Sequence, residues 1–446
     1  MITRAKSRQA PFERVGFAFS PVTVLATSNE HLGPATQAPA RACRFCGATD
    51  LHTFVDLGMS PLCESYLTAE QLDQMEPFYP LHVKVCGRCF LVQLAEYVAP
   101  EHIFTEYAYF SSFSDSWVQH ARAYVAAMVE QVGLSNTSFV VEVGSNDGYL
   151  LQHFVERGIP VLGIEPARNV ARAAVERQVP TLAAFFGAQT AADVVARHRP
   201  ADLVIANNVL AQVPDLNDFV RGLAGVLAPR GLLTLEFPHL LRLIAERQFD
   251  TIYHEHFSYF SLLTAERIFS AYGLAVVDVE ELPTHGGSLR LHVRHASEAV
   301  TPSQRVHKVR SDEAQAGLDK LDGYAGFTPG LNALKRRFLR VLISAKEAGK
   351  SVVGYGAPGK GNTLLNYCGV RTDFLDYTVD RNPYKHGRFL PGTHIPICPP
   401  ERIAETRPDL IVILPWNLKR EIISQLTYTR AWGAQFVVPI PNVQVL

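Results

Sequence analysis

Residues 140–151, VVEVGSNDGYLL, restrict the possible folds of this chain more than any other stretch. A β-branched run ends at Glu142, Gly144 follows closely, and Gly148 opens a segment with the periodicity of an amphipathic helix. Glycines let the backbone approach a ligand closely, and a helix N-terminus behind them favours polar or anionic groups. The stretch therefore predicts a strand, a glycine turn and a helix at a ligand-binding edge.

Strands and helices continue to alternate after this stretch. Helical patterns cover residues 169–178 and 216–227, and apolar strand-like runs end at Asn208 and Pro238. This alternation argues for an α/β fold with a doubly wound parallel sheet. Because such sheets bind ligands at the carboxyl ends of their strands, we expect the polar residues at these ends to converge on one crevice.

The acidic-x-Gly-x-x-x-Gly spacing differs from the G-x-G-x-x-G of dinucleotide sites and resembles the first motif of class I S-adenosylmethionine (SAM) methyltransferases. The next apolar run ends at Glu165, about twenty residues past Gly144, which is the offset expected of a ribose-binding carboxylate. For the loop alone, an ordinary strand–turn–helix is the alternative, and the convergence of three strand ends favours SAM. The residues assigned to the SAM site are Gly144, Ser145, Asn146, Asp147, Gly148, Glu165, Pro166, Asn207 and Asn208.

Four of the seven cysteines stand in two C-x-x-C pairs, Cys43 with Cys46 and Cys86 with Cys89. Each pair lies beside a glycine and can form a knuckle, and two knuckles supply the four thiolates that structural zinc prefers. Such a site leaves no open position for chemistry, so we expect one structural Zn²⁺ per chain. Reduced thiols or a redox pair are the alternative. Cys63 stands apart and is interpreted as a packing residue.

Residues 251–261, TIYHEHFSYFS, are dense in titratable and aromatic groups. As metal ligands, His254 and His256 would point the same way from a strand, but no third ligand is evident and the H-E-x-x-H spacing is absent. Histidines that cap the end of a strand are a second interpretation. As an acid–base group, an imidazole with a pKa near its usual value of about 6.5 can remove a proton at neutral pH. We favour the acid–base interpretation.

Composition limits the class of partner. The 446 residues carry 42 basic and 43 acidic side chains, so the net charge of -1 gives no basic field for nucleic acid. No apolar run reaches the length of about eighteen residues that a membrane span requires. No secretion signal follows the basic first residues, and residues 1–40 read as a polar, disordered tail. We expect a cytoplasmic enzyme with no membrane association and no evident obligatory protein partner.

Three features in order, the paired C-x-x-C knuckles, VVEVGSNDGYLL and YHEHFSYFS, resemble the sugar C-methyltransferases that act on nucleotide-linked deoxy-keto-sugars. The similarity covers about residues 41 to 446. It implies a β-rich zinc-binding domain at 41–103, a SAM-binding methyltransferase domain at 104–298, and a Rossmann-like domain with a helical linker at 299–446. It also implies SAM-dependent methylation of a carbon α to the ketone of a dTDP-linked 4-keto-sugar, in deoxysugar and antibiotic biosynthesis.

The resemblance makes His256 the general base, with Tyr253, Glu255 and Tyr107 lining the reacting sugar. A carbon can attack the SAM methyl only as an enolate-like nucleophile, so a base must remove a proton α to the ketone. A donor must also stabilise the oxyanion that develops. The chain departs from the family at Gln212, where a histidine is common, so an acid–base or orienting role at that position is open.

Residues 285–290, HGGSLR, resemble a family segment that faces the same cleft. The resemblance therefore implies that His285, Ser288 and Arg290 contact the substrate.

The last third of the chain contains a literal G-x-G-x-x-G at 354–359, with Asp380 about twenty residues beyond it. Alone, this pattern suggests an NAD-dependent oxidoreductase, which is the main alternative function. Pro358 inside the loop and Lys360 directly after it suit a phosphate in general rather than a nicotinamide cofactor. We expect Lys360 and Asn362 to hold the diphosphate or nucleoside of the substrate. A non-catalytic scaffold is a third possibility, which would leave the YHEH stretch without a role.

Overall fold

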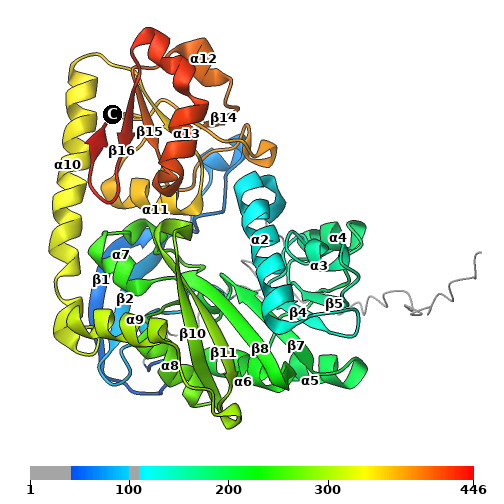
Figure 1. The fold of residues 1–446 in the computed structure, drawn as a ribbon. Helices are drawn as coiled ribbons and strands as arrows, with labels where there is room; N and C mark the ends of the chain where they lie inside the picture. The colour runs from blue at the N-terminus through cyan, green and yellow to red at the C-terminus, as the bar shows by residue number, and fades with distance from the viewer. Residues whose placement is uncertain (1–41, 100–109) are drawn as a thin grey trace, which may run out of the picture. The chain divides into compact units, whose positions relative to one another are not determined.

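The computed structural model describes residues 42–99 and 110–446 (Figure 1). The predicted tail at 1–40 and Tyr107 lie outside these ranges. Within them, the chain forms three β-sheets with covering helices. None of the helices in this part of the chain is long and apolar enough to cross a bilayer.

The first sheet is antiparallel, with the strand order β1-β2-β3-β9. Three of its strands follow one another near the start of the described chain: β1 (Leu51–Ser60), β2 (Tyr79–Cys86) and β3 (Val92–Leu94). The fourth, β9 (Ser258–Tyr259), comes from the histidine-containing segment and pairs with β3. Strands that are far apart in the sequence therefore hold this segment against the cysteine-bearing region.

The central sheet has the order β10-β11-β8-β7-β4-β5-β6. Strands β6, β5, β4, β7 and β8 are parallel, while β11 runs antiparallel to both β8 and β10. The prediction of a parallel sheet is thus correct for five strands and wrong at one edge, where a hairpin adds two more. The strands are β4 (Val140–Val143), β5 (Val161–Ile164), β6 (Thr181–Leu182), β7 (Ala201–Asn207), β8 (Leu227–Pro238), β10 (Leu274–Leu282) and β11 (Ser288–His295).

Helices cover both faces of the central sheet, because side chains along each strand alternate between two apolar layers. Val140 packs in the layer with α2, α3 and α4, and Val141 packs in the layer with α5, α6 and α8. This is the predicted doubly wound arrangement. The helices are α2 (Asp115–Val132), α3 (Gln152–Val155), α4 (Arg168–Glu176), α5 (Ala188–Arg197), α6 (Leu216–Val226), α7 (Leu240–Ala245) and α8 (Leu262–Ser270).

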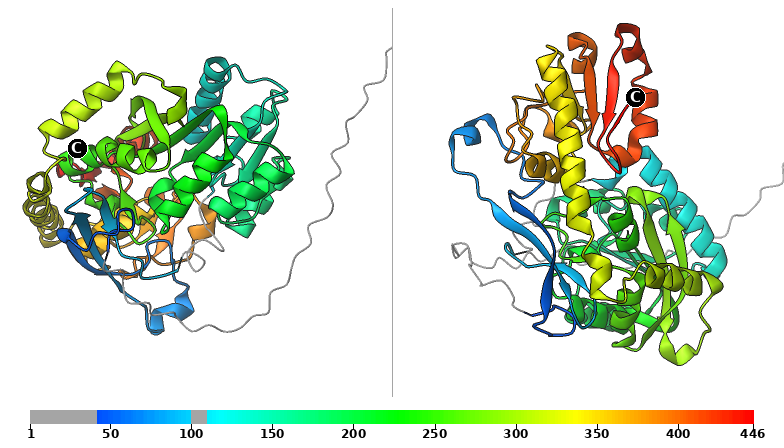
Figure 2. Two further views of the ribbon diagram at one scale, coloured as in Figure 1. Left: turned by 90° about the horizontal axis from the view of Figure 1, so that it is seen from below. Right: turned by 90° about the vertical axis from the view of Figure 1, so that its left-hand side faces the viewer.

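The third sheet has the order β14-β13-β12-β15-β16-β17 and is parallel except for β17. Two helices lead into it, α9 (Gln304–Gln315) and the long α10 (Phe327–Glu347), and Figure 2 shows α10 running past β1 and the third sheet. The other elements are β12 (Val352–Tyr355), α11 (Gly359–Cys368), β13 (Thr378–Val379), β14 (Ile397–Cys398), α12 (Arg402–Thr406), β15 (Leu410–Ile413), α13 (Lys419–Gln425), β16 (Gln435–Val438) and β17 (Gln444–Val445).

The first and third sheets share one apolar core. Phe54 of β1 stacks on Phe327 of α10 with ring centroids 4.8 Å apart and contacts Tyr324 edge-on at 6.2 Å. Aromatic pairs of this geometry add about 0.5–1.5 kcal/mol to the burial of their area. Strand β1, the helical linker and the last sheet are therefore packed against one another.

Candidate active site

The turn after β4 forms the SAM-side edge of the site. Gly144 has φ +66°, and a Cβ at this position would collide with Val209 after β7, so glycine permits both the backbone conformation and the close approach. Gly148 has φ +77°, and turns continue from it to the start of α3 at Gln152. The expectation that a helix opens at Gly148 is therefore wrong, because left-handed backbone there delays the helix by about one turn.

Glu165 stands just beyond β5 and is 7% exposed. Its two carboxylate oxygens accept hydrogen bonds from the backbone amides of Asn146, at 3.0 Å, and Ala167, at 2.9 Å. Burial raises the pKa of this carboxyl, and the two amides oppose that rise. Each oxygen retains a second lone pair, so the carboxylate can also accept ribose hydroxyls. Pro166, half-buried, leads from Glu165 into α4.

Several polar atoms at the strand ends are buried without a hydrogen-bond partner in the described part of the chain. Buried polar atoms are nearly always paired in folded proteins, so this group points to a polar ligand. The hydroxyls, amines and carboxylate of SAM can supply the missing partners, and the residues therefore fit this cofactor. The atoms are Glu142 Oε2, Ser145 Oγ, Asp147 Oδ1, Asn207 Oδ1 and Asn208 Oδ1.

The four paired cysteines lie together, with all four sulfurs within 4.8 Å of one another. Cys43 Sγ is 3.5 Å from Cys89 Sγ, and Cys46 Sγ is 3.6 Å from Cys86 Sγ. Tetrahedral zinc with Zn–S bonds of about 2.3 Å requires sulfurs separated by about 3.8 Å, so the cluster fits the ion. Four thiolates would fill its coordination shell, and the metal therefore has a structural role.

His256 lies in a turn before β9, not on a strand. Its Nδ1 is 2.9 Å from the carbonyl oxygen of Thr251. Because a carbonyl only accepts hydrogen bonds, Nδ1 carries the proton and Nε2 keeps a free lone pair. The pKa of His256 is lowered to about 4, mainly by burial and in part by the charges of His285 and Lys360, while the hydrogen bond to Thr251 opposes the shift. The side chain is thus a neutral acceptor at neutral pH.

His254 has a different environment. Its Nε2 contacts the carbonyl oxygen of Pro80 at 3.2 Å, and its ring meets Tyr79 and Tyr97 edge-on. The two histidines do not point the same way, because the turn sends His254 into the first sheet. A shared metal site at His254 and His256 is therefore excluded by their geometry.

Tyr253 and Glu255 alternate with the two histidines along the chain. The Tyr253 ring lies 4.0 Å from the His256 ring, centroid to centroid, and burial raises the pKa of its phenol well above the usual value. Glu255 is buried and its Oε1 accepts a hydrogen bond from the thiol of Cys63 at 3.5 Å. The prediction that Cys63 is a packing residue overlooked this contact, which depends on the tertiary fold.

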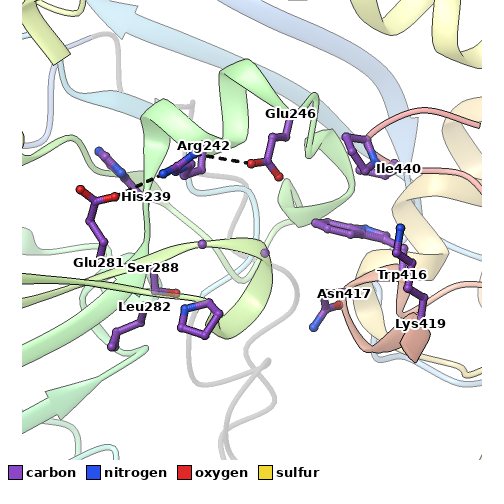
Figure 3. Close-up of a pocket in the computed structure, with 14 residues that line it drawn as sticks. His239, Arg242, Glu246, Glu281, Leu282, Ser288, Trp416, Asn417, Lys419 and Ile440 are labelled. Atoms are coloured by element: carbon purple, nitrogen blue, oxygen red, sulfur yellow. Dashed lines mark hydrogen bonds and ion pairs between the residues drawn. The ribbon is translucent and has the colours of Figure 1, made fainter. Parts of the chain in front are cut away.

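A cavity of about 520 Å³ lies by the β10–β11 turn and the loop after β15 (Figure 3), and its lining does not include Tyr253, Glu255 or the two histidines. Trp416 and Asn417 approach it from the loop after β15, opposite Arg242 and Glu246 of the α7 region. Ser288 also lines it, with its hydroxyl donating to the carbonyl oxygen of Thr284 at 3.0 Å. The volume is within the range of about 300–1,000 Å³ that is typical of small-molecule sites.

His285 lies at the tight turn between β10 and β11, with φ +54°, and its ring meets Trp117 of α2 edge-on at 5.3 Å. Trp117 also stacks on Tyr149 of the glycine turn, at 6.1 Å. Rings of these three residues therefore connect the SAM-side turn to the edge of the cavity.

Arg290 is buried and already paired. Its guanidinium lies 3.0 Å from a carboxylate oxygen of Glu236 and 3.4 Å from one of Glu280. Glu236 also accepts a hydrogen bond from Thr284 Oγ1 at 2.7 Å, and the pKa of its carboxyl is lowered to about 2 despite burial, by His120 and Arg290. Arg290 thus braces the turn that carries His285, behind the cavity wall.

The glycine-rich loop at 354–359 is covered by the first domain. The Ala357 carbonyl accepts hydrogen bonds from the Tyr66 hydroxyl, at 2.6 Å, and Lys385 Nζ, at 2.8 Å. Asp380 accepts the Ala357 amide at 2.7 Å, so it closes the loop on itself. A dinucleotide needs this backbone free for its pyrophosphate, so the packing disfavours the NAD-dependent alternative.

Lys360 and Asn362 lie at the start of α11. Lys360 Nζ donates to Asn417 Oδ1 at 3.2 Å and lies 5.3 Å from the centre of the Trp416 ring. The Asn362 amide donates to the Cys63 carbonyl at 2.5 Å, and its Oδ1 is buried without a partner among the described residues. The structure therefore places Lys360 beside the cavity and Asn362 under the Cys63 loop.

Gln212 is half-exposed in a short 3₁₀ turn, Leu210–Gln212, after β7. The preceding residue, Ala211, accepts the backbone amide of Phe257 at 2.7 Å, so this turn lies against the segment that carries His256. Gln212 therefore adjoins a residue that contacts this segment, and nothing in the structure assigns its side chain a chemical role.

Three family profiles match the chain in order. A "Putative zinc binding domain" covers residues 43–104, a "Methyltransferase domain" covers 117–279, and a "C-methyltransferase C-terminal domain" covers 283–441. The profile of the C-terminal domain begins at residue 283 and so includes β11, although β11 pairs with β8 in the central sheet.

The C-methyltransferase NovU of Streptomyces niveus is 37% identical over 408 residues, which are 92% of this chain and 97% of NovU. A ubiquinone biosynthesis O-methyltransferase of Rhodopseudomonas palustris (strain BisA53) is 31% identical over 97 residues, 22% of this chain and 38% of that protein. The solved structure of magnesium protoporphyrin IX methyltransferase from Synechocystis PCC 6803 with bound SAM covers 40% of this chain and 78% of its own, with 16% identity and a TM-score of 0.30.

Proposed function

Because the chain belongs to the family of SAM-dependent C-methyltransferases with a zinc-binding domain, we propose that it methylates a carbon α to the ketone of a nucleotide-linked deoxy-4-keto-sugar. The nucleotide is dTDP in this proposal, and the reaction belongs to deoxysugar and natural-product biosynthesis. The proposal rests on the resemblance of the three ordered motifs and on the site around His256.

One observation carries the proposal: the tautomer of His256. The Thr251 carbonyl holds the proton on Nδ1, so Nε2 is a fixed, neutral proton acceptor in the interior of the protein. Methyl transfer to an oxygen or nitrogen that already has a lone pair does not require a carbon acid to be deprotonated. A buried base next to a phenol is therefore the feature that suits transfer to carbon.

In the mechanism we propose, His256 Nε2 takes the proton α to the ketone, and the electron pair of the broken C–H bond moves onto the carbonyl oxygen. The Tyr253 phenol remains protonated because burial raises its pKa, so it can donate a hydrogen bond to that oxygen. Glu255 accepts a hydrogen bond from the Cys63 thiol, and we propose that it holds the segment that carries His256. The electron pair then returns to the carbon and forms the new C–C bond as the bond between the methyl group and the sulfur of its donor breaks, with S-adenosylhomocysteine as the leaving group.

SAM, when bound, supplies an electrophilic methyl group on its sulfonium. The residues proposed to hold it are those at the ends of β4, β5 and β7: Gly144, Ser145, Asn146, Asp147, Gly148, Glu165, Pro166, Asn207 and Asn208. Fixing the methyl against the carbanion supplies much of the rate enhancement, because an in-line arrangement of two bound reactants removes the entropy cost of their encounter.

The cavity supports the placement of the rest of the substrate. It reaches Ser288 and the turn that carries His285, and Lys360 bonds to Asn417 in its wall. We propose His285, Ser288, Arg290, Lys360 and Asn362 as the substrate-side residues, with Arg290 acting through Glu236 and the turn. Tyr107, also proposed to line the sugar, lies outside the described residues.

The test is an incubation of the purified protein with SAM and a panel of dTDP-4-keto-deoxysugars, read by mass spectrometry. The expected product gains one methyl group on carbon, located by fragmentation or by NMR. A parallel incubation with NADH in place of SAM tests the alternative function, an NAD-dependent oxidoreductase. Reduction of a keto-sugar by NADH, with no methyl gain from any sugar on addition of SAM, would overturn the proposal.

A further inference from the structure

Asp250 is a fully buried carboxylate in the 3₁₀ turn Phe249–Thr251. Its Oδ2 accepts a hydrogen bond from Trp416 Nε1 at 2.6 Å, and its Oδ1 has no partner among the described residues. The next residue, Thr251, supplies the carbonyl that fixes the tautomer of His256. Asp250 therefore links the base to the loop after β15.

Lys360 contacts the ring of the same tryptophan, whereas Asp250 contacts its N–H. Its ammonium faces the Trp416 ring at 5.3 Å and donates to Asn417, the next residue along the loop. Three separate segments thus bring one buried carboxylate and one ammonium into contact with a single indole, the first at its N–H and the second over its ring. Asp250 raises the pKa of Lys360, against the larger effect of burial, so the carboxylate helps to keep the lysine charged.

The positive charge of Lys360 reaches the reacting groups. Besides Asp250, the groups whose pKa responds to it are His256 and His285, and both pKa values are lowered. A neutral histidine with a lowered pKa is a weaker base than free imidazole. Removal of a proton α to a ketone therefore depends strongly on stabilising the negative charge on the ketone oxygen.

The surroundings of Lys360 do not suit a diphosphate. Phosphates are usually held by free backbone N–H groups of a glycine loop, and here the Ala357 amide is bonded to Asp380. Tyr66 and Lys385 cover the same loop. A polyanion beside Lys360 would also meet the carboxylate of Asp250. A single oxygen that carries one developing negative charge meets neither obstacle.

We propose that Lys360 is the cation that stabilises the enolate oxyanion when His256 removes the α-proton, and that Asp250 is its positioning residue. This inference rests on the proposed function and gives Lys360 a role on the sugar ketone instead of the diphosphate. In the step, the C–H bond breaks, the proton moves to His256 Nε2 and the electron pair moves to the ketone oxygen beside the ammonium. No further reactant is needed.

The experiment measures exchange of the α-proton with deuterated water, with S-adenosylhomocysteine present so that no methyl is transferred. Lys360→Met should lower the maximal exchange rate by roughly 10²–10³-fold, the usual effect of removing one oxyanion donor, with a change in KM of less than about threefold. Lys360→Arg keeps the charge and should recover part of the rate. Lys320→Met, at an exposed lysine between α9 and α10, is the matched control and should exchange like the wild type.

Asp250→Asn keeps an acceptor for Trp416 but removes the charge, so it should also lower the exchange rate. If Asp250 acts through Lys360, the double variant should be no slower than Lys360→Met alone. Melting temperature and zinc content check that each variant is folded. If Lys360→Met does not fold, Lys360→Gln replaces it in the same measurements.

The outcomes separate this inference from the proposed function. If the wild type exchanges no proton of any keto-sugar, the proposed function fails and the inference falls with it. If the wild type exchanges and Lys360→Met matches its maximal rate with a raised KM, Lys360 binds the phosphates and the inference alone is wrong. If the fold-losses in exchange rate of the two single variants multiply in the double variant, Asp250 and Lys360 act independently, and the positioning role of Asp250 is wrong.

Discussion

Replacement of Glu165 tests whether the carboxylate after β5 binds the ribose of SAM. Both of its oxygens already accept backbone amides, from Asn146 at 3.0 Å and from Ala167 at 2.9 Å. Hydrogen bonds to a charged group contribute about 1.5–3 kcal/mol. Since about 1.4 kcal/mol is a factor of ten, Glu165→Ala should weaken SAM binding by roughly 10- to 150-fold.

Glu165→Gln should have a smaller effect. The side-chain amide keeps one oxygen acceptor without its charge, and a neutral hydrogen bond contributes about 0.5–1.5 kcal/mol. The nitrogen of the new side chain, however, faces one of the two backbone N–H groups and cannot accept from it. We expect a loss of affinity of roughly five- to tenfold, between the wild type and the alanine variant.

The assay is isothermal titration of each variant with SAM, together with its melting temperature without ligand. Glu165→Ala leaves two buried amides without acceptors, so it also lowers the stability of the free protein. Asp202→Ala is the matched control, because Asp202 accepts the Phe139 amide at 2.8 Å at the opposite end of the neighbouring strands. It should lower the melting temperature and leave SAM affinity unchanged. Affinity of Glu165→Ala within twofold of the wild type would refute the ribose contact.

Three further outcomes follow from the structure. The purified protein should contain about one zinc per chain. The double variant Cys43→Ser with Cys86→Ser should lose the metal and have a lower melting temperature. Elemental analysis that finds a full zinc content in this variant would contradict the assignment. His256→Asn should retain SAM binding but lose methyl transfer by about a hundredfold or more, and wild-type proton exchange in this variant would identify another base. Burial raises the pKa of Asp250 from 3.8 to about 6, so the folded protein keeps a proton that the unfolded chain loses, and the contribution of this carboxyl to stability falls by on the order of 3 kcal/mol as pH rises from 4 to 6. In denaturant titrations, Asp250→Asn should therefore be more stable at pH 6 than at pH 4 by about this amount relative to the wild type, and an equal difference at both pH values would show that Asp250 does not titrate in this range.

Local sequence patterns were enough to predict the central architecture. The run at 140–151 and the carboxylate at Glu165 are set by short-range spacing, and the strand ends that carry them meet in the structure as a doubly wound sheet requires. The two C-x-x-C pairs are equally local, and their four sulfurs lie together. Patterns of this kind depend on neighbours in the sequence, so they can be interpreted without tertiary information.

Other features depend on contacts that a single sequence does not reveal. The pairing of β9 with β3 joins residues more than 160 positions apart, and periodicity does not identify partners at that distance. His254 and His256 are two residues apart and chemically identical, and only the direction of the turn separates a packed ring from a free acceptor. Asp250 carries no motif, because its importance comes from Trp416, which reaches it from the last domain.

The arrangement around Phe257 explains why a zinc site far from the chemistry can still control it. Phe257 follows His256 directly, and its carbonyl accepts the amide of Leu94 from the first sheet while its own amide donates to Ala211 of the central domain. Arg44, inside the first C-x-x-C pair, lies over the Phe257 ring with its guanidinium carbon 5.4 Å from the ring centre. The segment that carries His256, the proposed base, is therefore held from both domains at once. Loss of zinc would free one of the two, so we expect the metal to help position this histidine, although it has no coordination position for a substrate.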